Sequence, residues 1–154
     1  MSRLLASQLK KPSEAVSEQL LHRQVAAYLR YQYPGVMFRT DYAAGQYKAS
    51  IYHRRMHKEM QSTRAWPDVF IAEPCATEFG DYHGLFLELK REGVRIYKKD
   101  GSVVANQHYQ EQDRVLEFLR LKGYRAEFAI GLDQAKQIID EYLGGPKVEQ
   151  DEAF

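Results

Sequence analysis

Residues 65–93, AWPDVFIAEPCATEFGDYHGLFLELKREG, decide the fold. Two apolar runs in this stretch, PDVFIAEP and HGLFLELKRE, predict β-strands. Both runs carry charge where a buried strand is usually apolar. Asp68 follows Pro67 at the start of the first run, and Glu88 and Lys90 lie inside the second. These three charged residues require an explanation.

Strand geometry places the charges together. Alternate residues of a strand share a face, so the three leucines of GLFLELK line one face while Glu88 and Lys90 lie on the other. A Glu–Lys pair on an exposed edge strand would be an ordinary salt bridge, worth less than ~1 kcal/mol. Asp68 makes the pair more informative, because a neighbouring strand would bring it to the same end of the sheet. We therefore expect two carboxylates and a lysine to converge.

Carboxylates at this density are hard oxygen ligands of the kind that Mg²⁺ or Mn²⁺ prefers. A divalent cation would stabilise carboxylates that otherwise repel each other and lose hydration. Such a metal can lower the pKa of a bound water, orient a phosphate and stabilise the leaving oxygen, which is the chemistry of phosphodiester hydrolysis. Lys90 cannot bind the metal as an ammonium, but it can hold a water or a phosphate oxygen.

The overall composition limits the class of protein. With 154 residues, 44% of them hydrophobic, the chain can build one globular domain. The net charge of +1 does not by itself indicate nucleic acid. Cys75 is the single cysteine, which excludes an internal disulfide and fits a reducing compartment. No signal peptide or membrane span is evident, so we expect a cytoplasmic protein with no membrane partner.

Periodicity and turn signals predict the order of elements along the chain. We expect an N-terminal extension (1–12), one domain (13–144) and a flexible tail (145–154). The predicted order is helix, strands, helix, strand, helix, which indicates a mixed α/β domain with helices flanking a sheet. The predicted elements are a helix over 13–31, a strand in GVMFRTD, a basic helix over 48–61, the two strands quoted above, two strands around the KKDG turn of VRIYKKDGSVV with Gly101 at positive φ, a helix over 106–122 stopped by Gly123, a strand in YRAEFAIG, and a last helix in LDQAKQIIDEYLGG capped by Asp133.

The spacing PD…E-x-K resembles the PD-(D/E)XK nuclease superfamily, and three further segments resemble its VRR-NUC branch. SEQLLHRQVAAYL is similar to the opening helix of that family, with Glu18 as its glutamate. RAWPDVFI is similar to the strand entry, although Ala65 stands where the family usually has glycine. HYQEQDRVLEFLRLKGYRAEFAIGLDQAKQIIDEYL is similar to the closing segment. The resemblance extends from about Glu14 to Leu143 in the right order.

The resemblance implies a restriction-endonuclease-like fold with a catalytic metal site. In that site Lys90 assists the chemistry, and Glu18 contributes directly or through water, with Glu14 as the alternative. A glutamine approaches the site from a helix. The family pattern L-x-x-x-G places it at Gln112, with Gln107 and Gln110 nearby. The implied catalytic residues are Glu18, Asp68, Glu88, Lys90 and Gln112, and the implied metal ligands are Asp68, Glu88, the backbone carbonyl of Leu89, and Glu18.

A basic segment precedes Asp68. Residues 47–64 hold five Lys or Arg and two His against one acid, interleaved with aromatic residues. A duplex backbone would be attracted to such a face, although charge runs are often only solvated. The tip of the KKDG turn is a second candidate arm. Neither stretch has a base-reading motif, so we expect recognition of backbone and shape. The candidate DNA-binding residues are Lys48, Arg54, Arg55, Lys58, Arg64, Lys98 and Lys99.

The sequence thus predicts a Mg²⁺- or Mn²⁺-dependent DNA endonuclease without an organic cofactor. The resemblance implies branched, flapped or Holliday-junction-like DNA as substrates. Stand-alone members of the family are often phage or prophage proteins, and some members form homodimers. The main alternative is a DNA-binding or assembly module that keeps the fold without catalysis. A different metal-dependent enzyme such as a phosphatase would leave the basic segment unexplained.

Overall fold

The computed structural model describes residues 18–41, 50–77 and 80–146. Two candidates from the sequence, Glu14 and Lys48, lie outside these ranges. The first helix is described over residues 18–32. The other elements are β1 (Phe38–Thr40), α2 (Ile51–Glu59), β2 (Val69–Ile71), β3 (Cys75–Thr77), β4 (Gly80–Tyr82), β5 (Leu85–Lys90), α3 (Gln107–Leu121), β6 (Arg125–Ile130) and α4 (Gly131–Leu143). The predicted mixed α/β domain, with helices flanking a sheet, is confirmed.

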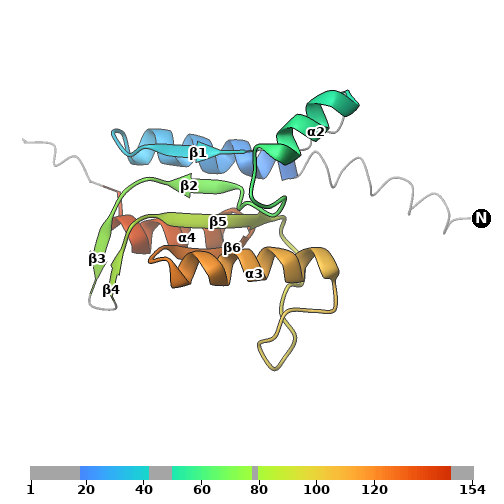
Figure 1. The fold of residues 1–154 in the computed structure, drawn as a ribbon. Coiled ribbons are helices and arrows are strands. Elements are labelled where there is room, and N and C mark those ends of the chain that lie inside the picture. Colours follow the sequence, from blue (N-terminus) through green and yellow to red (C-terminus); the bar gives the residue numbers. More distant parts are fainter. Residues whose placement is uncertain (1–17, 42–49, 78–79, 147–154) are drawn as a thin grey trace, which may run out of the picture.

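Four strands form one sheet in the order β1-β2-β5-β6, and β3 and β4 form a separate hairpin (Figure 1). β2 runs antiparallel to both β1 and β5, whereas β6 runs parallel to β5. Because β2 and β5 are antiparallel, the start of β2 and the end of β5 lie at the same end of the sheet. The topology therefore brings Asp68, just before β2, close to the last residues of β5.

Apolar side chains cover both faces of the sheet. The first helix and α4 pack on one face, and α3 packs on the other. All six residues of β5 are buried, because β5 lies in the middle of the sheet between these layers. The first core cluster includes Leu21, Val25, Leu29, Val69, Ile71, Leu85, Leu87, Leu89, Ile138 and Ile139, and the second includes Phe86, Ile96, Leu116, Leu119 and Phe128.

The predicted bounds of α3 are confirmed by its caps. The Asn106 side chain accepts a hydrogen bond from the Tyr109 N–H, which satisfies a donor at the start of the helix. Gly123 follows the C-cap with a φ of 93°. A Cβ at this position would lie 2.6 Å from the His83 ring, so both the backbone conformation and the close contact require glycine.

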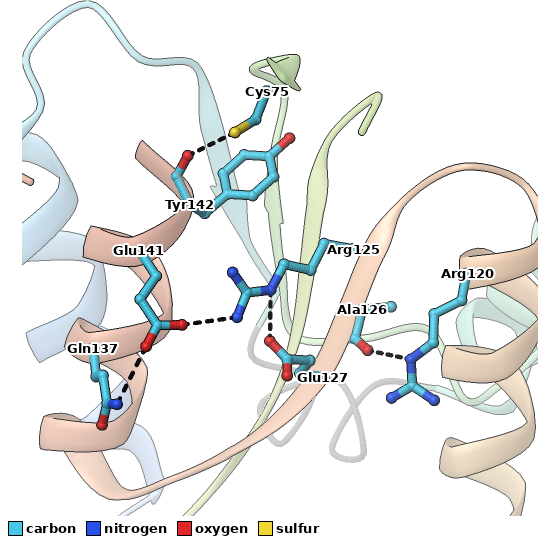
Figure 2. A network of polar contacts seen from close by, with 8 residues as sticks. All are labelled: Cys75, Arg120, Arg125, Ala126, Glu127, Gln137, Glu141 and Tyr142. Atoms are coloured by element: carbon cyan, nitrogen blue, oxygen red, sulfur yellow. Dashed lines mark hydrogen bonds and ion pairs between the residues drawn. The ribbon is translucent and has the colours of Figure 1, made fainter. Parts of the chain in front are cut away.

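Polar contacts fix α4 against the sheet (Figure 2). Arg125 of β6 pairs with Glu127 at 2.8 Å and with Glu141 of α4 at 3.0 Å. The Cys75 thiol donates to the Tyr142 carbonyl at 3.0 Å. A strand and a hairpin remote in sequence are thereby both attached to the same helix.

A second polar contact joins the first helix to α4. Tyr28 Oη donates to Asp140 Oδ1 at 2.8 Å, and Tyr33 Oη donates to the same oxygen at 2.5 Å. Burial and the Asp140 carboxylate raise the pKa of Tyr28 to about 12, and they raise the pKa of Tyr33 further. Both phenols therefore remain protonated donors at neutral pH.

Several local predictions were wrong. VRIYKKDGSVV forms one bridge, Tyr97 with Val103, around a turn in which Gly101 has the expected positive φ of 85°, instead of two strands. α4 begins at Gly131 without a side-chain cap, so Asp133 lies in its first turn. The described part of the basic segment is helical only over Ile51–Glu59. The β3–β4 hairpin was not predicted. No helix in the described part of the chain is long and apolar enough to cross a membrane.

Candidate active site

Asp68 is held by the backbone of β5. The β2–β5 ladder ends where Val69 faces Leu87, so the next N–H on that side, that of Leu89, lies beyond the ladder. The Asp68 Oδ2 atom accepts from this N–H at 2.8 Å. Ala65, which replaces the usual glycine, is buried and adopts no positive φ. The approach to Asp68 therefore tolerates a Cβ at this position.

Glu88 lies at the centre of a buried polar cluster. Its side chain points from β5 toward α3, where Gln112 Nε2 donates to Glu88 Oε1 at 2.6 Å. Lys90 Nζ donates to the same oxygen at 3.2 Å and lies 4.9 Å from the centre of the Tyr109 ring. Glu88 and Lys90 are only 4% and 9% exposed, so this pair differs from the exposed salt bridge considered as the simple alternative.

Asp68 and Glu88 lie close enough for each carboxyl group to affect the pKa of the other. Burial, together with the Asp68 charge, raises the pKa of Glu88 well above its ordinary value, although Lys90 opposes the shift. Burial also raises the pKa of Asp68, against the effects of His22 and the Leu89 N–H. Two neighbouring carboxyl groups, of which Glu88 is buried and Asp68 partly buried, disfavour two negative charges unless a further positive charge balances them.

The first helix brings two further residues to this end of the sheet. His22 is 7% exposed, and its Nε2 atom lies 3.8 Å from Asp68 Oδ2. Glu18, one turn earlier, is exposed and lines the same cavity. His22 was not singled out from the sequence. The available signal was its position four residues after Glu18, on the same helix face.

A cavity of about 400 Å³ contains these groups. All five predicted catalytic residues contribute to its walls, as does Leu89. Of the three candidate glutamines, Gln112 is the one that contacts Glu88, whereas Gln107 bonds to Glu111 and Gln110 to the Val104 carbonyl. Residues that sequence reasoning did not place in the site also line the cavity: His22, Asp41, His57, Trp66, His108 and Tyr109.

The carboxylates do not form a cluster of three. Within residues 18–41, 50–77 and 80–146, no group of three or more His, Cys, Asp or Glu side chains is arranged to hold a metal ion. Glu18 shares the cavity with Asp68 and Glu88, but it does not complete such a group.

The predicted DNA-binding residues that the structure describes are all exposed. Arg54, Arg55 and Lys58 lie on α2, which buries none of its side chains, and Arg64 lines the cavity. Lys98 and Lys99 occupy the turn between β5 and α3. In Figure 1, α2 lies on one side of the sheet near the end where β5 stops, whereas the loop that carries this turn projects beyond α3 on the other side. Of the two candidate arms, α2 is therefore the one that lies beside the end of the sheet.

Comparison with solved structures gives an informative likeness. No protein-family model matches the sequence, and no curated protein matches it. Among solved structures, the chain is similar to one described as "VRR_NUC domain protein", with a TM-score of 0.55 and 21% sequence identity over 86% of this chain and 97% of the other. At this identity the likeness concerns the fold. The chain shares the fold of this VRR_NUC domain protein, as its motifs predicted.

Proposed function

We propose that this chain is a Mg²⁺- or Mn²⁺-dependent deoxyribonuclease that hydrolyses phosphodiester bonds in the cavity at the end of β2 and β5. The observation that carries the proposal is the convergence of Asp68 and Glu88 on one cavity, with Lys90 and Gln112 both donating to the same Glu88 oxygen. The VRR-NUC fold supports a nuclease over other metal-dependent hydrolases. The exposed cations around the cavity support nucleic acid as substrate.

The donor set fits a divalent cation. Asp68 and Glu88 supply two carboxylates with raised pKa values, whose mutual repulsion a cation would relieve. The Leu89 N–H points at Asp68, and in an extended strand the carbonyl of the same residue points to the same side. Gln112 Oε1 is a buried acceptor without a hydrogen-bond donor among the described residues, which suits a site built to hold further polar groups.

When bound, the metal would activate water and stabilise negative charge on the phosphate. The protein would supply orientation and charge. Lys90, held between Glu88 and the Tyr109 ring, would direct its ammonium at a phosphate oxygen or the attacking water. Gln112 would hold the Glu88 carboxylate in place. Glu18 and His22 would close the side of the cavity formed by the first helix.

Cleavage assays test the proposal. Purified Asp68→Asn and Lys90→Ala variants would be compared with wild type on duplex, flapped and four-way-junction DNA, with Mg²⁺ or Mn²⁺. We expect metal-dependent cleavage by wild type and a loss of at least ~10²-fold in both variants. Asp81→Asn is the matched control, because Asp81 is exposed in the β3–β4 hairpin. Undiminished cleavage by both site variants would overturn the assignment. DNA binding without cleavage of any substrate would favour the non-catalytic module.

A further inference from the structure

A second groove lies beside the candidate active site. It has a volume of about 470 Å³ and runs between the segment that follows α2 and the outer side of α3. Lys58 and Arg64 contribute from the first wall, and Arg114 contributes from α3. Gln61 and Arg64 line both this groove and the catalytic cavity, so the two hollows are adjacent. A strand bound in one would therefore pass close to the other.

The charge in this groove is unbalanced. Three cations line it, against one described carboxylate, that of Glu111. Glu111 accepts a hydrogen bond from Gln107 at 3.5 Å, and it forms no ion pair with a cation in the part of the chain that the structure describes. Within the described ranges, none of the side chains of Lys58, Arg64 and Arg114 forms an ion pair with a carboxylate. Cations that are concentrated in a hollow and left without carboxylate partners create a positive potential that favours an anion.

We propose that this groove, formed by Lys58, Arg64 and Arg114, binds the sugar-phosphate backbone of nucleic acid next to the phosphate that is cleaved. The inference rests on the proposed nuclease function and deepens it, because it assigns the path of the strand outside the cavity. Cations that line an open surface groove contact phosphates in any sequence, so we expect binding to be independent of base sequence. Arg114, which the charge pattern of residues 47–64 could not indicate, is part of this path.

Binding of fluorescein-labelled DNA to the metal-free protein tests the groove without requiring cleavage. We expect Lys58→Gln and Arg114→Gln each to weaken binding roughly 3- to 10-fold, equally for two unrelated sequences, and to lower the slope of log K against log salt by roughly 0.7–0.9. Arg30→Gln is the control. Arg30 is exposed and lies about 18 Å along the first helix from Glu18, at 1.5 Å per residue.

A third groove variant should change DNA affinity in the opposite direction. Glu111→Gln removes the single described acid of the groove and should tighten DNA binding, whereas Glu117→Gln, on a different side of the same helix, should leave it unchanged. A damaged fold could not produce tighter binding, so this pair separates charge from folding. Equal affinities for the three groove variants and the two control variants would overturn the groove while leaving the nuclease proposal intact. Absence of DNA binding by wild type at low salt would overturn both, and binding without metal-dependent cleavage would overturn the nuclease alone.

Discussion

Gln112 Nε2 donates a hydrogen bond of 2.6 Å to Glu88 Oε1, between residues 24 positions apart in the chain. The bond joins α3 to the central strand of the sheet, and it lies between the second core cluster and the cavity. Gln112 is thus both a packing contact of α3 and the residue that positions Glu88. The register of one helix on the sheet thereby determines how the Glu88 carboxyl group is held.

Replacing Gln112 should reduce cleavage without unfolding the protein. Gln112→Leu keeps the size of the buried side chain but removes the donor to Glu88, so we expect a loss of about 10- to 100-fold in cleavage rate at limiting metal. A higher metal concentration should restore part of the rate. Gln107→Leu is the control, because Gln107 is exposed on the same helix. Equal rates for the two variants, measured over a range of Mn²⁺ concentrations, would show that Gln112 does not position Glu88.

Glu88→Gln should stabilise the metal-free protein at neutral pH. Because the pKa of Glu88 is raised in the folded state, the unfolded chain ionises first as pH rises, and wild type loses stability until the pH passes the folded pKa. Gln cannot ionise, so the variant avoids this loss. A gain of about 1 kcal/mol corresponds to a rise in Tm of roughly 2–4 °C for a domain of this size.

Thermal melts in EDTA at several pH values would measure the effect. The difference in Tm between the variant and wild type should be small at pH 4 and should grow toward pH 8. A variant that is less stable than wild type throughout this range would contradict the proposed repulsion between Asp68 and Glu88.

Metal binding should stabilise the protein and release protons. A cation that binds only the folded state raises the free energy of unfolding by about 2.7 kcal/mol at one hundred times its Kd. It also replaces the proton that the raised pKa values favour on the Asp68–Glu88 pair. Calorimetric titration with Mn²⁺ in buffers of different ionisation enthalpy would count the protons. Asp68→Asn should abolish both effects, whereas the same response in wild type and Asp68→Asn would place the metal elsewhere.

Trp66 should report entry of nucleic acid into the cavity. It is the only tryptophan of the chain, it is 43% exposed at the cavity, and its ring lies 5.9 Å from that of Phe86. We therefore expect the tryptophan emission of the Asp68→Asn protein to change on addition of DNA. An unpaired base that stacks on the indole would contribute about 1–3 kcal/mol to binding, so Trp66→Phe should weaken binding of single-stranded DNA more than that of duplex. Unchanged emission at saturating DNA would exclude entry.

The contact between Tyr28, Tyr33 and Asp140 should make the protein sensitive to high pH. The ordinary tyrosine pKa is about 10, and that of Tyr28 is raised to about 12. The unfolded chain therefore loses these protons first, and stability should fall as pH rises from about 10 toward 12. Tyr33→Phe should lower the free energy of unfolding by about 1.5–3 kcal/mol at pH 7. It should also reduce the fall in stability above about pH 10. Tyr31→Phe is the control, because Tyr31 is 75% exposed. Denaturation curves at each pH would measure the effect. Parallel curves for wild type and Tyr33→Phe would contradict this role.

Strong local signals were sufficient to predict the strand that carries Glu88 and Lys90 and the helix that carries Gln112. In both segments, alternation or helical spacing agrees with clear end signals, such as Gly123 after α3. The contact of His22 with Asp68 could not be predicted, because it depends on how the first helix docks on the sheet. Arg114 was missed for a similar reason, since its groove exists only after α3 packs beside residues 58–64. The β3–β4 pairing is short and follows Pro74, where the hydrophobic pattern gives little guidance.

The first helix serves two purposes at its two ends. Tyr28 lies in its last turns and Tyr33 directly follows it, and both are tied to Asp140, whereas His22 and Glu18 lie toward its described beginning, at the cavity. Protein engineering can exploit this separation. Libraries that vary the cavity end leave the tyrosine contact intact, so substrate preference can be altered while the helix stays in place.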